Sequence, residues 1–398
     1  MANTLKFGNG QWATKVGSTL AYNDEGGNFK PLPFNFTRST SGTRVNKDGL
    51  IEVITNNKPR IDFLNDSNGA LLLEPERTNL QVNSEEFDNP LWLKNRASIT
   101  PNDAISPSGL LNADKLVGTS GSSSYVYDGI SVTFESAYTI SVFAKYIDIE
   151  EFVIVNFTQS GNAYFNIENG TIISNFGTIT EPKIENYGNG WYRCSAKFTA
   201  TATASVNYGF YLNNATDKSV HIWGAQVELG SYATSYIPTQ GAISTKVDEV
   251  CSDAGNNQVI NSIEGVLYWN IITQDKNSSS KAISINNGIN TILSIYFYSS
   301  SINVVFNVNG VNQFYANFGL TIGQEYKIAV LYQENNFALY VNGVKRAEDT
   351  NGSVPSVDTF DRLNLSEVSG GKFYGNVKEV KLYNTALTDQ ELINLTTI

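Results

Sequence analysis

The chain has 398 residues, of which 41% are hydrophobic and 16% are charged, and its formal net charge is −11. This length exceeds one ordinary hydrophobic core, so we expect more than one domain, and the composition excludes a disordered or fibrous protein. The negative charge, with no cluster of Lys or Arg to offset it, argues against both nucleic acid and an anionic membrane as partners.

The composition also favours an all-β fold. There are 21 Tyr and 21 Phe, with Asn, Ser, Thr and Gly between the apolar segments. Aromatic and β-branched residues favour strands, and Asn and Gly favour turns. We therefore predict two antiparallel β-sandwich (jelly-roll) domains in series behind a short N-terminal segment.

The N-terminal sequence MANTLKFGNGQWATKVG lacks a basic region followed by an apolar segment. We therefore expect no cleaved signal peptide and a protein made in the cytosol. No segment approaches the ~18 consecutive apolar residues of a membrane helix. Cys194 and Cys251 are far apart, without a Cys-x-x-Cys motif, which excludes a thiolate zinc site. We expect both to be reduced, and a disulfide between them remains an alternative.

Residues 1–35 are expected to be a separate segment, followed by a β-hairpin connector at residues 36–80. In the connector, the turn Lys47-Asp48-Gly49 joins two short strands, and the sequence EPERTNL then leads into the middle of the chain.

Residues 81–247 are predicted to form the first β-sandwich. The sequences AYTISVFAKYI and EFVIVNFTQ alternate with period two, and GWYRCSAKFTATATASVNYGFYL contains two strands. In SVHIWGAQVEL, the alternation places one set of side chains (Val220, Ile222, Gly224) opposite another (His221, Trp223, Ala225). Polar residues then interrupt the pattern, and we expect a linker at residues 248–262.

Residues 263–398 are predicted to form the second sandwich. The segment 326–350 places alternate side chains on one face (Tyr326, Ile328, Val330, Tyr332), followed by a turn at Glu334-Asn335-Asn336 and a strand from Phe337 to Val341. Asn342-Gly343 and Asn309-Gly310 predict type I′ hairpin turns, since both residues tolerate a positive φ. A strand from Val377 to Tyr383 precedes a short helix that Thr388 caps, with Glu391 closing a capping box.

The hairpins of this last region and its ending GNVKEVKLYNTALTDQEL resemble laminin-G-like or concanavalin-A-like jelly rolls. Five segments of the middle region (NSEEFDNPLW, LNADKLVG, AYTISVFAK, NGWYRCSAKFTA and HIWGAQVELGSYATSYIPTQG) resemble, in this order, a carbohydrate-binding-module-like jelly roll of bacteriophage structural proteins. Residues 36–80 resemble the element that precedes this module in phage tail and head-fibre proteins. Residues 1–35 resemble the N-terminal attachment segments of such proteins.

Catalytic residues are not predicted. His221 has no Gly-x-Ser-x-Gly nucleophile near it in the pattern, so we interpret it as a half-exposed strand residue. The segment KYIDIEEF is similar in part to the Glu-x-Asp-x-x-Glu strand of retaining glucanases. Asp148 and Glu151 match two of its positions, but Tyr146 occupies that of the nucleophile. We therefore expect no enzyme.

No cofactor is predicted, and structural calcium is kept as an alternative. Three segments offer clustered oxygen donors: NDEGG (23–27), NKDG (46–49) and NDSNG (65–69). None has the full Asp-x-Asp-x-Asp-Gly pattern, and the same residues form ordinary turns.

Sugar binding fits the composition best, because aromatic faces stack on sugar rings while amide and carboxylate groups bind hydroxyls. Trp191 and Trp223 match positions that belong to the core in the resembling family. The candidate glycan-binding residues are Tyr125, Tyr127, Tyr232, Tyr236, Tyr296 and Tyr298.

The resemblance implies a bacteriophage virion protein, a fibre or spike on the head or the tail. It implies a homotrimer that residues 1–35 attach to other capsid or tail proteins, with bacterial surface polysaccharide as the ligand. Its location would be the virion, assembled in the host cytoplasm. A virion-associated glycan depolymerase and a capsid decoration protein without an external ligand are the alternatives.

Overall fold

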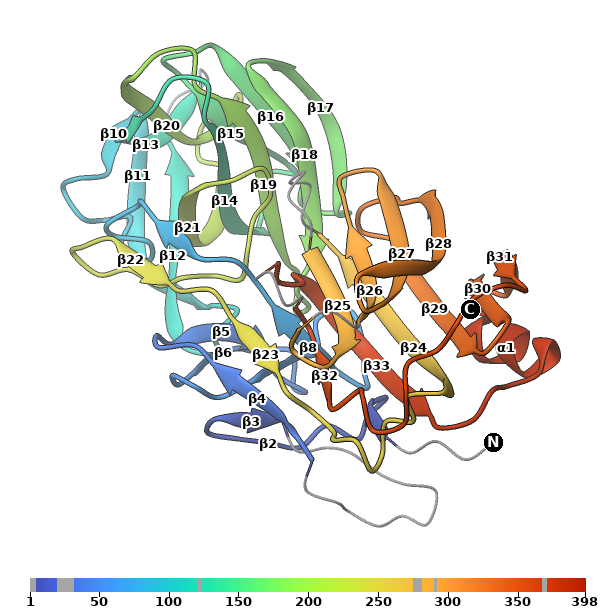
Figure 1. Ribbon diagram of the computed structural model, residues 1–398. Coiled ribbons are helices and arrows are strands. Elements are labelled where there is room, and N and C mark those ends of the chain that lie inside the picture. The colour runs from blue at the N-terminus through green and yellow to red at the C-terminus, as the bar shows by residue number, and fades with distance from the viewer. Residues whose placement is uncertain (1–4, 20–31, 120–122, 275–280, 290–291, 367–370) are drawn as a thin grey trace. The chain divides into compact units, whose positions relative to one another are not determined.

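The computed structural model describes residues 5–19, 32–119, 123–274, 281–289, 292–366 and 371–398 (Figure 1). It consists of antiparallel sheets and confirms the predicted all-β class of sandwich domains. Two compact units are present. Unit 1 comprises Met1–Ser41, Ile54–Pro75 and Val247–Ile398, and unit 2 comprises Gly42–Val53 and Glu76–Lys246.

Unit 2 is a sandwich of two six-stranded sheets. The first, called here the β13 sheet, has the order β10 (Leu93–Asn95), β13 (Ser124–Val132), β20 (Ala204–Leu212), β15 (Glu151–Asn156), β16 (Gly161–Asn166) and β17 (Thr171–Gly177). The second, the β21 sheet, has the order β11 (Ala97–Ile105), β12 (Leu111–Gly118), β21 (Ser219–Leu229), β14 (Ala137–Tyr146), β19 (Trp191–Thr199) and β18 (Ile179–Asn186).

The core of unit 2 lies between these sheets and follows from their period-two alternation. Val126, Phe210 and Ile154 from the β13 sheet pack in one apolar cluster with Ile140 and Cys194 from the β21 sheet. The residues between these positions therefore lie on the outer faces of the sandwich.

The alternation in β21 changes phase at Gly224, which corrects one detail of the sequence pattern. Gly224 has a φ of +65°, and the pairing of β14 with β21 shifts between Ser141 and Phe143. Such an irregularity inserts an extra residue into one strand. Ala225 consequently lies in the core with Ile222, and not beside Trp223 as the simple alternation predicts.

Two short pairs complete unit 2. They are the hairpin of β5 (Gly42–Val45) and β6 (Ile51–Ile54), and the pair of β9 (Arg77–Asn79) and β22 (Ser244–Lys246). The hairpin contains the predicted Lys47-Asp48-Gly49 turn, in which Gly49 has a φ of +78° and the Asn46 side chain accepts from the N–H groups of Asp48 and Leu50.

Among its described residues, unit 1 contains three sheets. The largest has the order β31 (Val344–Asp349), β30 (Asn336–Val341), β29 (Glu325–Gln333), β24 (Glu264–Thr273), β33 (Gly375–Tyr383), β8 (Ala70–Leu73) and β7 (Arg60–Asp62), with β1 (Leu5–Gly8) also paired to β33. A five-stranded sheet contains β28 (Val311–Gly319), β27 (Ser301–Val308), β26 (Ile292–Phe297), β25 (Lys281–Asn286) and β32 (Arg362–Asn364). A four-stranded sheet contains β2 (Thr14–Lys15), β3 (Ser18–Thr19), β4 (Phe34–Thr37) and β23 (Val250–Ser252).

The local predictions for the last third of the chain are confirmed. The alternate side chains of β29 (Tyr326, Ile328, Val330, Tyr332) all lie in the core of unit 1. Both Asn-Gly turns have positive φ angles, with Asn342 at +50° and Gly343 at +78°. The helix α1 (Asp389–Thr396) starts at Thr388 with the complete capping box, and Leu392 packs against the largest sheet. Among the described residues, no helix has the length and apolar character that crossing a membrane requires.

The ends of the expected segments are built into these sheets. Within the expected attachment segment of residues 1–35, Leu5 and Phe7 of β1 are fully buried in the core of unit 1. Within the expected linker of residues 248–262, Cys251 and Ile260 lie in the same core. The expected connector of residues 36–80 contributes β7 and β8 to unit 1 and the β5–β6 turn to unit 2. In these three segments the backbone pairs with distant strands and apolar side chains enter the core. The local sequence pattern does not reveal these long-range contacts.

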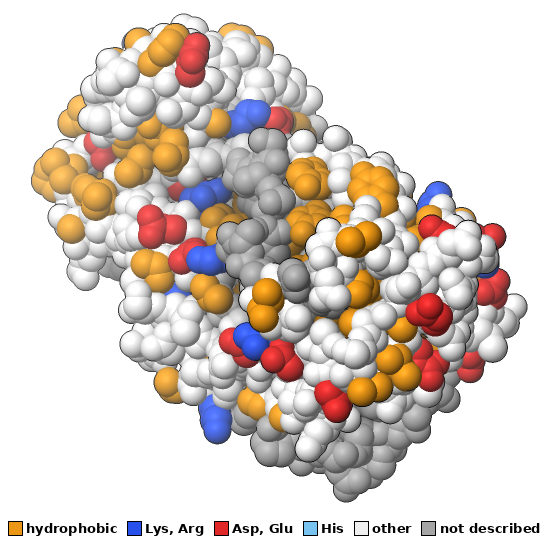
Figure 2. Space-filling model, viewed as in Figure 1, with side chains coloured by type: hydrophobic (Ala, Val, Ile, Leu, Met, Phe, Trp, Pro, Cys, Tyr) orange, Lys and Arg blue, Asp and Glu red, His pale blue; other side chains and the backbone are white. Residues whose placement is uncertain are grey.

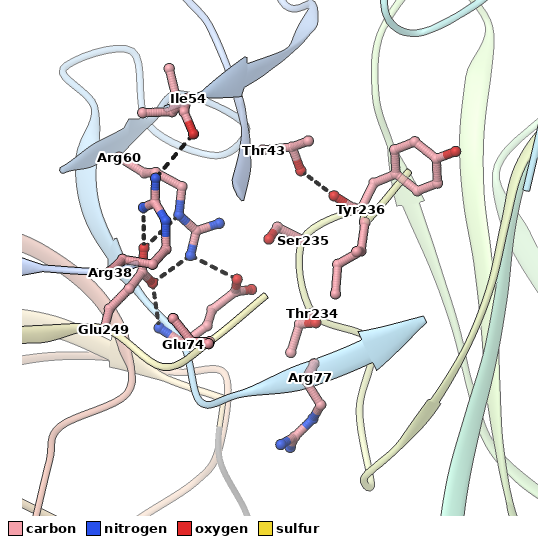
Figure 3. Close-up of polar contacts among 12 residues, drawn as sticks. Arg38, Thr43, Ile54, Arg60, Glu74, Arg77, Thr234, Ser235, Tyr236 and Glu249 are labelled. Atoms are coloured by element: carbon pink, nitrogen blue, oxygen red, sulfur yellow. Dashed lines mark hydrogen bonds and ion pairs between the residues drawn. The ribbon is translucent and has the colours of Figure 1, made fainter. Parts of the chain in front are cut away.

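A buried ion network lies where the chain of unit 1 leaves for unit 2 and returns (Figure 3). The Glu249 carboxylate accepts from Nη1 of Arg38 at 2.7 Å and from Nε of Arg60 at 2.7 Å. Arg60 also pairs with Glu74 at 2.8 Å, and Arg38 donates to the carbonyl oxygens of Ile54 and Thr55. Two cations and two anions balance, which a network removed from water requires.

The pKa of each arginine shows which contribution dominates. Burial lowers the pKa of Arg38 from its ordinary value, although Glu249 opposes this shift. Burial also acts to lower the pKa of Arg60, but the attraction of Glu249 and Glu74 outweighs burial, and its pKa is raised. Arg60 is therefore held as a cation between two carboxylates.

Candidate functional site

The outer face of the β13 sheet gathers aromatic side chains from three strands and from the residue that follows a fourth. In one cross-strand row, Tyr125 of β13 pairs with Tyr211 of β20, and Val153 of β15 separates Tyr211 from Tyr164 of β16. The adjacent row places Tyr127 of β13 opposite Gly209 of β20. Directly paired residues lie on the same face of a sheet. The register therefore puts four tyrosines together although they are far apart in sequence.

The rings make direct contacts around Phe157, which follows β15. The ring centroids of Tyr125 and Phe157 are 4.7 Å apart, those of Tyr127 and Phe157 are 5.7 Å apart, and the two tyrosines are 5.6 Å apart. All three rings are half-buried. We call Tyr125, Tyr127, Phe157, Tyr164 and Tyr211 the tyrosine face.

Gly209 makes room for this cluster. A Cβ at this position would lie 2.3 Å from the carbonyl oxygen of Val126 and 2.8 Å from Cβ of Tyr127. A side chain there would displace Tyr127, so glycine is required by the close approach of the two strands.

Polar groups accompany the rings. The side-chain amide of Asn162 donates to the Tyr164 hydroxyl at 2.9 Å. Burial raises the pKa of Tyr211, and its hydrogen bond with Tyr164 adds to this effect. Asn95 pairs with Tyr125, so a second amide lies beside the rings. Aromatic surface and amide groups together are the chemistry that recognises a sugar ring and its hydroxyls.

The same face is open at its β10 edge. Leu93, which pairs with Tyr127, is 50% exposed, and Leu91 beside it is 55% exposed. In Figure 2, which has the view of Figure 1, hydrophobic side chains lie at the surface over β10 and β13. Apolar surface continues from the tyrosine face to solvent at this edge.

The structure brings only two of the six predicted glycan-binding residues, Tyr125 and Tyr127, into this face. Tyr232 is half-buried with the Arg77 guanidinium 5.5 Å from its ring centroid. Tyr236 is 3% exposed and packs on Trp223 at 4.6 Å between ring centroids, while its hydroxyl bonds Ser84 and Glu85. A ring enclosed in this way offers no face to a ligand, which corrects the assignment of Tyr236.

Tyr236 belongs to a segment that packs on the outer face of the β21 sheet. The buried Arg193 guanidinium donates to the carbonyl oxygen of Thr234 at 2.6 Å. The buried Glu228 carboxylate accepts from both the N–H and the hydroxyl of Thr234. Burial raises the pKa of Glu228. These polar groups hold the segment that contains Thr234 and Tyr236 in place, and their hydrogen-bonding capacity is used for this.

Tyr296 and Tyr298 lie in unit 1. Ile295 and Phe297 point into the core, and Tyr296 is half-buried on the outer side of β26. Tyr298 lies in the turn after β26. Tyr315 on β28, which the sequence analysis did not select, is 55% exposed.

His221 lies on β21 as interpreted, half-buried, and its role is defined by its partner. Its Nε2 is 2.9 Å from Oδ2 of Asp103, which also pairs with Lys115 at 3.1 Å. The hydrogen bond with His221 and that with Lys115 lower the pKa of Asp103.

The partial glucanase pattern is dispersed by the fold. Tyr146 ends β14 in the β21 sheet, Asp148 lies in the connection, and Glu151 begins β15 in the other sheet. Asp148 accepts from the N–H of Ser219 at 2.6 Å. The three residues therefore do not share a strand, which the motif needs to align its carboxylates.

No group of three or more His, Cys, Asp or Glu residues with metal-binding geometry occurs within the described ranges. In the turns at 46–49 and 65–69, Asn46 and Asp66 accept from backbone N–H groups two residues on. The segment at 23–27 lies outside the described residues.

Tyr164, Tyr211 and Phe157 were not selected from the sequence. Tyr164 and Tyr211 both alternate with core residues (Phe165 and Phe210) on strands, a signal that places them on an outer face. Only the pairing of β20 with β13 and β15 shows that this is the face of Tyr125.

The fold and the site define an all-β protein whose sandwiches expose tyrosine on a sheet face. Residues 265–393 match the family model of the concanavalin A-like lectin/glucanases superfamily, so this part is a laminin-G-like, concanavalin-A-like domain, as the sequence resemblance implies. The match covers part of unit 1 only.

Solved structures similar to the chain include domain 4 of an extracellular arabinanase from Geobacillus stearothermophilus in complex with arabinotriose (14% identity, 42% of this chain and 83% of that chain, TM-score 0.33). A putative carbohydrate-binding protein from Bacteroides ovatus is similar over 71% of this chain and 82% of its own (13% identity, TM-score 0.28). Domains LG4-5 of mouse laminin alpha1 are similar over 69% of this chain and 93% of their own (10% identity, TM-score 0.26). A comparison with curated protein sequences gave no match.

Proposed function

We propose that this protein is a glycan-binding adhesin without catalytic activity, and that the tyrosine face is its binding surface. The observation that carries the proposal is the register that places Tyr125, Tyr127, Tyr164 and Tyr211 on one face beside amide side chains. Four aromatic side chains on a sheet provide an extended stacking surface that suits several linked sugar rings better than one.

A glycan array with the full chain tests this function, followed by affinity measurements on the best ligand. Tyr127→Ala removes a ring that contacts both Tyr125 and Phe157, without entering the core. We expect about a fivefold loss of affinity, the equivalent of about 1 kcal/mol for one aromatic contact.

Phe134→Ala is the matched control, because Phe134 is 54% exposed in the same unit and lies in the turn after β13. Its affinity should equal that of the wild type. Binding that survives both Tyr127→Ala and Tyr211→Ala unchanged would place the ligand elsewhere and refute the proposed surface.

A depolymerase is the second candidate from the sequence. The dispersal of Tyr146, Asp148 and Glu151 over two sheets argues against it, since a glycosidase needs two carboxyl groups facing one bond. Incubation with host capsular polysaccharide followed by an assay for new reducing ends tests this. Sustained release of reducing ends would overturn the non-catalytic assignment.

We further propose that the adhesin is a bacteriophage fibre or spike, on the head or the tail, acting as a homotrimer attached to other virion proteins. The five sequence segments of the middle region that resemble, in the same order, a module of bacteriophage structural proteins support this proposal. Several copies on one particle would strengthen a weak single-site affinity for bacterial polysaccharide.

Cryo-electron microscopy of the particle tests the location, the copy number and the docked end. Three-fold density with residues 1–35 nearest the capsid or tail is the expected result. Stable attachment to capsids together with an array that gives no binding would instead favour the decoration protein.

A further inference from the structure

The β21 sheet carries a hollow of about 190 Å³ on its outer side, within unit 2 and separate from the tyrosine face. Four structural elements form its walls: the β5–β6 turn, the β11–β12 loop, β14 and the turn before β19. The lining residues used below are Leu50, Ile105, Lys145, Tyr187, Asn189 and Trp191. Pockets for drug-sized ligands measure roughly 300–1,000 Å³, so this hollow fits one small ring.

Hydrogen bonds hold the walls. The Trp191 indole N–H donates to the carbonyl oxygen of Ile105 at 3.0 Å. The backbone N–H of Ile51 donates to the carbonyl oxygen of Pro107 at 2.8 Å. Tyr187 bonds the backbone of Trp191 at 2.9 Å, and its ring meets the edge of Phe143 at 4.8 Å between centroids. The hollow is therefore formed before a ligand arrives, which limits the entropy lost on binding.

Lys145 gives the hollow its charge. Its side chain is half-buried, with its stem beside the turn at Gly190. Across the strands, Lys145 pairs with His221 on one side and with Trp191 on the other. In the part of the chain that the structure describes, no carboxylate or other side chain forms an ion pair or hydrogen bond with its ammonium group.

The neighbouring charges leave this ammonium group uncompensated. Lys115, His221 and Lys145 form one cross-strand row. Asp103 pairs with Lys115 and with His221, at the end of the row opposite Lys145, so its negative charge is placed at those two residues. A cation in a low-dielectric recess attracts an anion more strongly than one in open solvent. In a chain of net charge −11, the recess is a local site for a negative group.

We propose that this hollow binds a carboxylate-bearing sugar, a uronic acid unit of a polysaccharide, with the carboxylate on Lys145 and the ring against the half-buried Tyr187. The amide of Asn189 at the rim would bind a hydroxyl group. This inference rests on the proposed glycan-binding function and assigns to it an acidic class of ligand. The site is distinct from the tyrosine face because it lies on the other sheet.

The test is calorimetric or NMR titration of the full chain at low salt with D-glucuronate, D-glucose and acetate. Glucuronate should bind at least tenfold more tightly than glucose, which lacks the carboxylate, and than acetate, which lacks the ring. Lys145→Met should lower glucuronate affinity at least tenfold and leave glucose unchanged, while Lys145→Arg should retain most of it.

Lys183→Met is the matched control, since Lys183 lies on β18 of the same sheet, is 51% exposed and pairs with Glu185. It should bind glucuronate like the wild type. Equal affinity for glucose and glucuronate, or full affinity in Lys145→Met, overturns the acidic subsite.

The two proposals fail in different ways. If the array detects neutral glycans whose binding depends on Tyr127 but glucuronate does not bind, only the acidic subsite falls. If glucuronate binding depends on Lys145 and no binding depends on Tyr127, the tyrosine face is refuted as a binding surface, while the hollow is supported as one. Binding of acetate as tight as that of glucuronate would reduce the hollow to an anion site and overturn its assignment to a sugar.

Discussion

At the scale of single residues, Asp114 shows how burial sets chemistry in unit 2. Its side chain is 2% exposed and accepts from the N–H of Phe87 and from that of Asn102, each at 2.9 Å. Burial outweighs these bonds and raises its pKa from 3.8 to about 6. The folded protein therefore binds a proton here that the unfolded chain releases at lower pH.

This shift predicts a pH dependence of stability. Between pH 4 and pH 6 the folded state holds more protons at Asp114 than the unfolded state, so the free energy of unfolding falls as the pH rises through this window. We expect a decrease of about 2 kcal/mol from this residue, since each pKa unit corresponds to about 1.4 kcal/mol and partial solvent screening reduces the effect.

Urea unfolding of the wild type and of Asp114→Asn at a series of pH values measures the effect. The variant should lack this contribution, so that the difference between the two proteins changes between pH 4 and pH 6. A difference that is constant over this range would contradict a raised pKa at Asp114.

At the scale of elements, β1 makes the N-terminal segment part of unit 1. It pairs with β33 from Leu5 opposite Leu382 to Gly8 opposite Glu379, and Leu5 and Phe7 are fully buried. From the sequence we expect residues 1–35 to be a separate segment. Because β1 completes part of the core of unit 1, their removal should destabilise that unit.

Phe7→Ala is predicted to lower the stability of unit 1 by about 3–5 kcal/mol, the usual cost of truncating a buried aromatic side chain. Calorimetry of the full chain should show the transition of unit 1 at a lower temperature, with that of unit 2 unchanged.

Lys6→Ala is the control on the same strand, because Lys6 lies outside the apolar core and its partner Glu379 keeps a second ion pair with Lys381 at 3.0 Å. Its effect should be clearly smaller than that of Phe7→Ala. An equally small effect of Phe7→Ala would show that β1 is dispensable and would restore the view of a separate attachment segment.

At the scale of the whole molecule, the chain does not complete one unit before it starts the next. It passes between the units after Ser41, Val53, Pro75 and Lys246. The buried ion network of unit 1 lies close to three of these crossing points. It contains Arg38, Glu74 and Glu249, each of which is at most three residues from one of them. This network joins segments that are far apart in sequence.

Glu249→Gln is predicted to destabilise unit 1 by about 3–5 kcal/mol, because it leaves Arg38 without a counter-ion in a site removed from water. Glu348→Gln breaks an exposed pair with Lys345 and should cost less than about 1 kcal/mol. Denaturant unfolding compares the two. Equal stability of Glu249→Gln and the wild type would mean that solvent compensates the network.

The sequence by itself determined features whose cause is local. Period two in Tyr326–Tyr332, the left-handed turn at Asn342-Gly343 and the capping box of Thr388 and Glu391 depend on backbone preferences within a few residues. These features were enough to predict an all-β fold and the strands of the laminin-G-like domain.

Only the tertiary structure decided which residues meet. The pairing of Tyr125 with Tyr211 and the burial of Tyr236 depend on strand register and on a covering segment, and neither is encoded near the residue concerned. The same holds for Lys145 between His221 and Trp191, and for Phe7 against β33. Long-range pairing is selected by the total burial of apolar surface, so the binding surfaces and the interleaved units follow from the whole fold and not from any one segment.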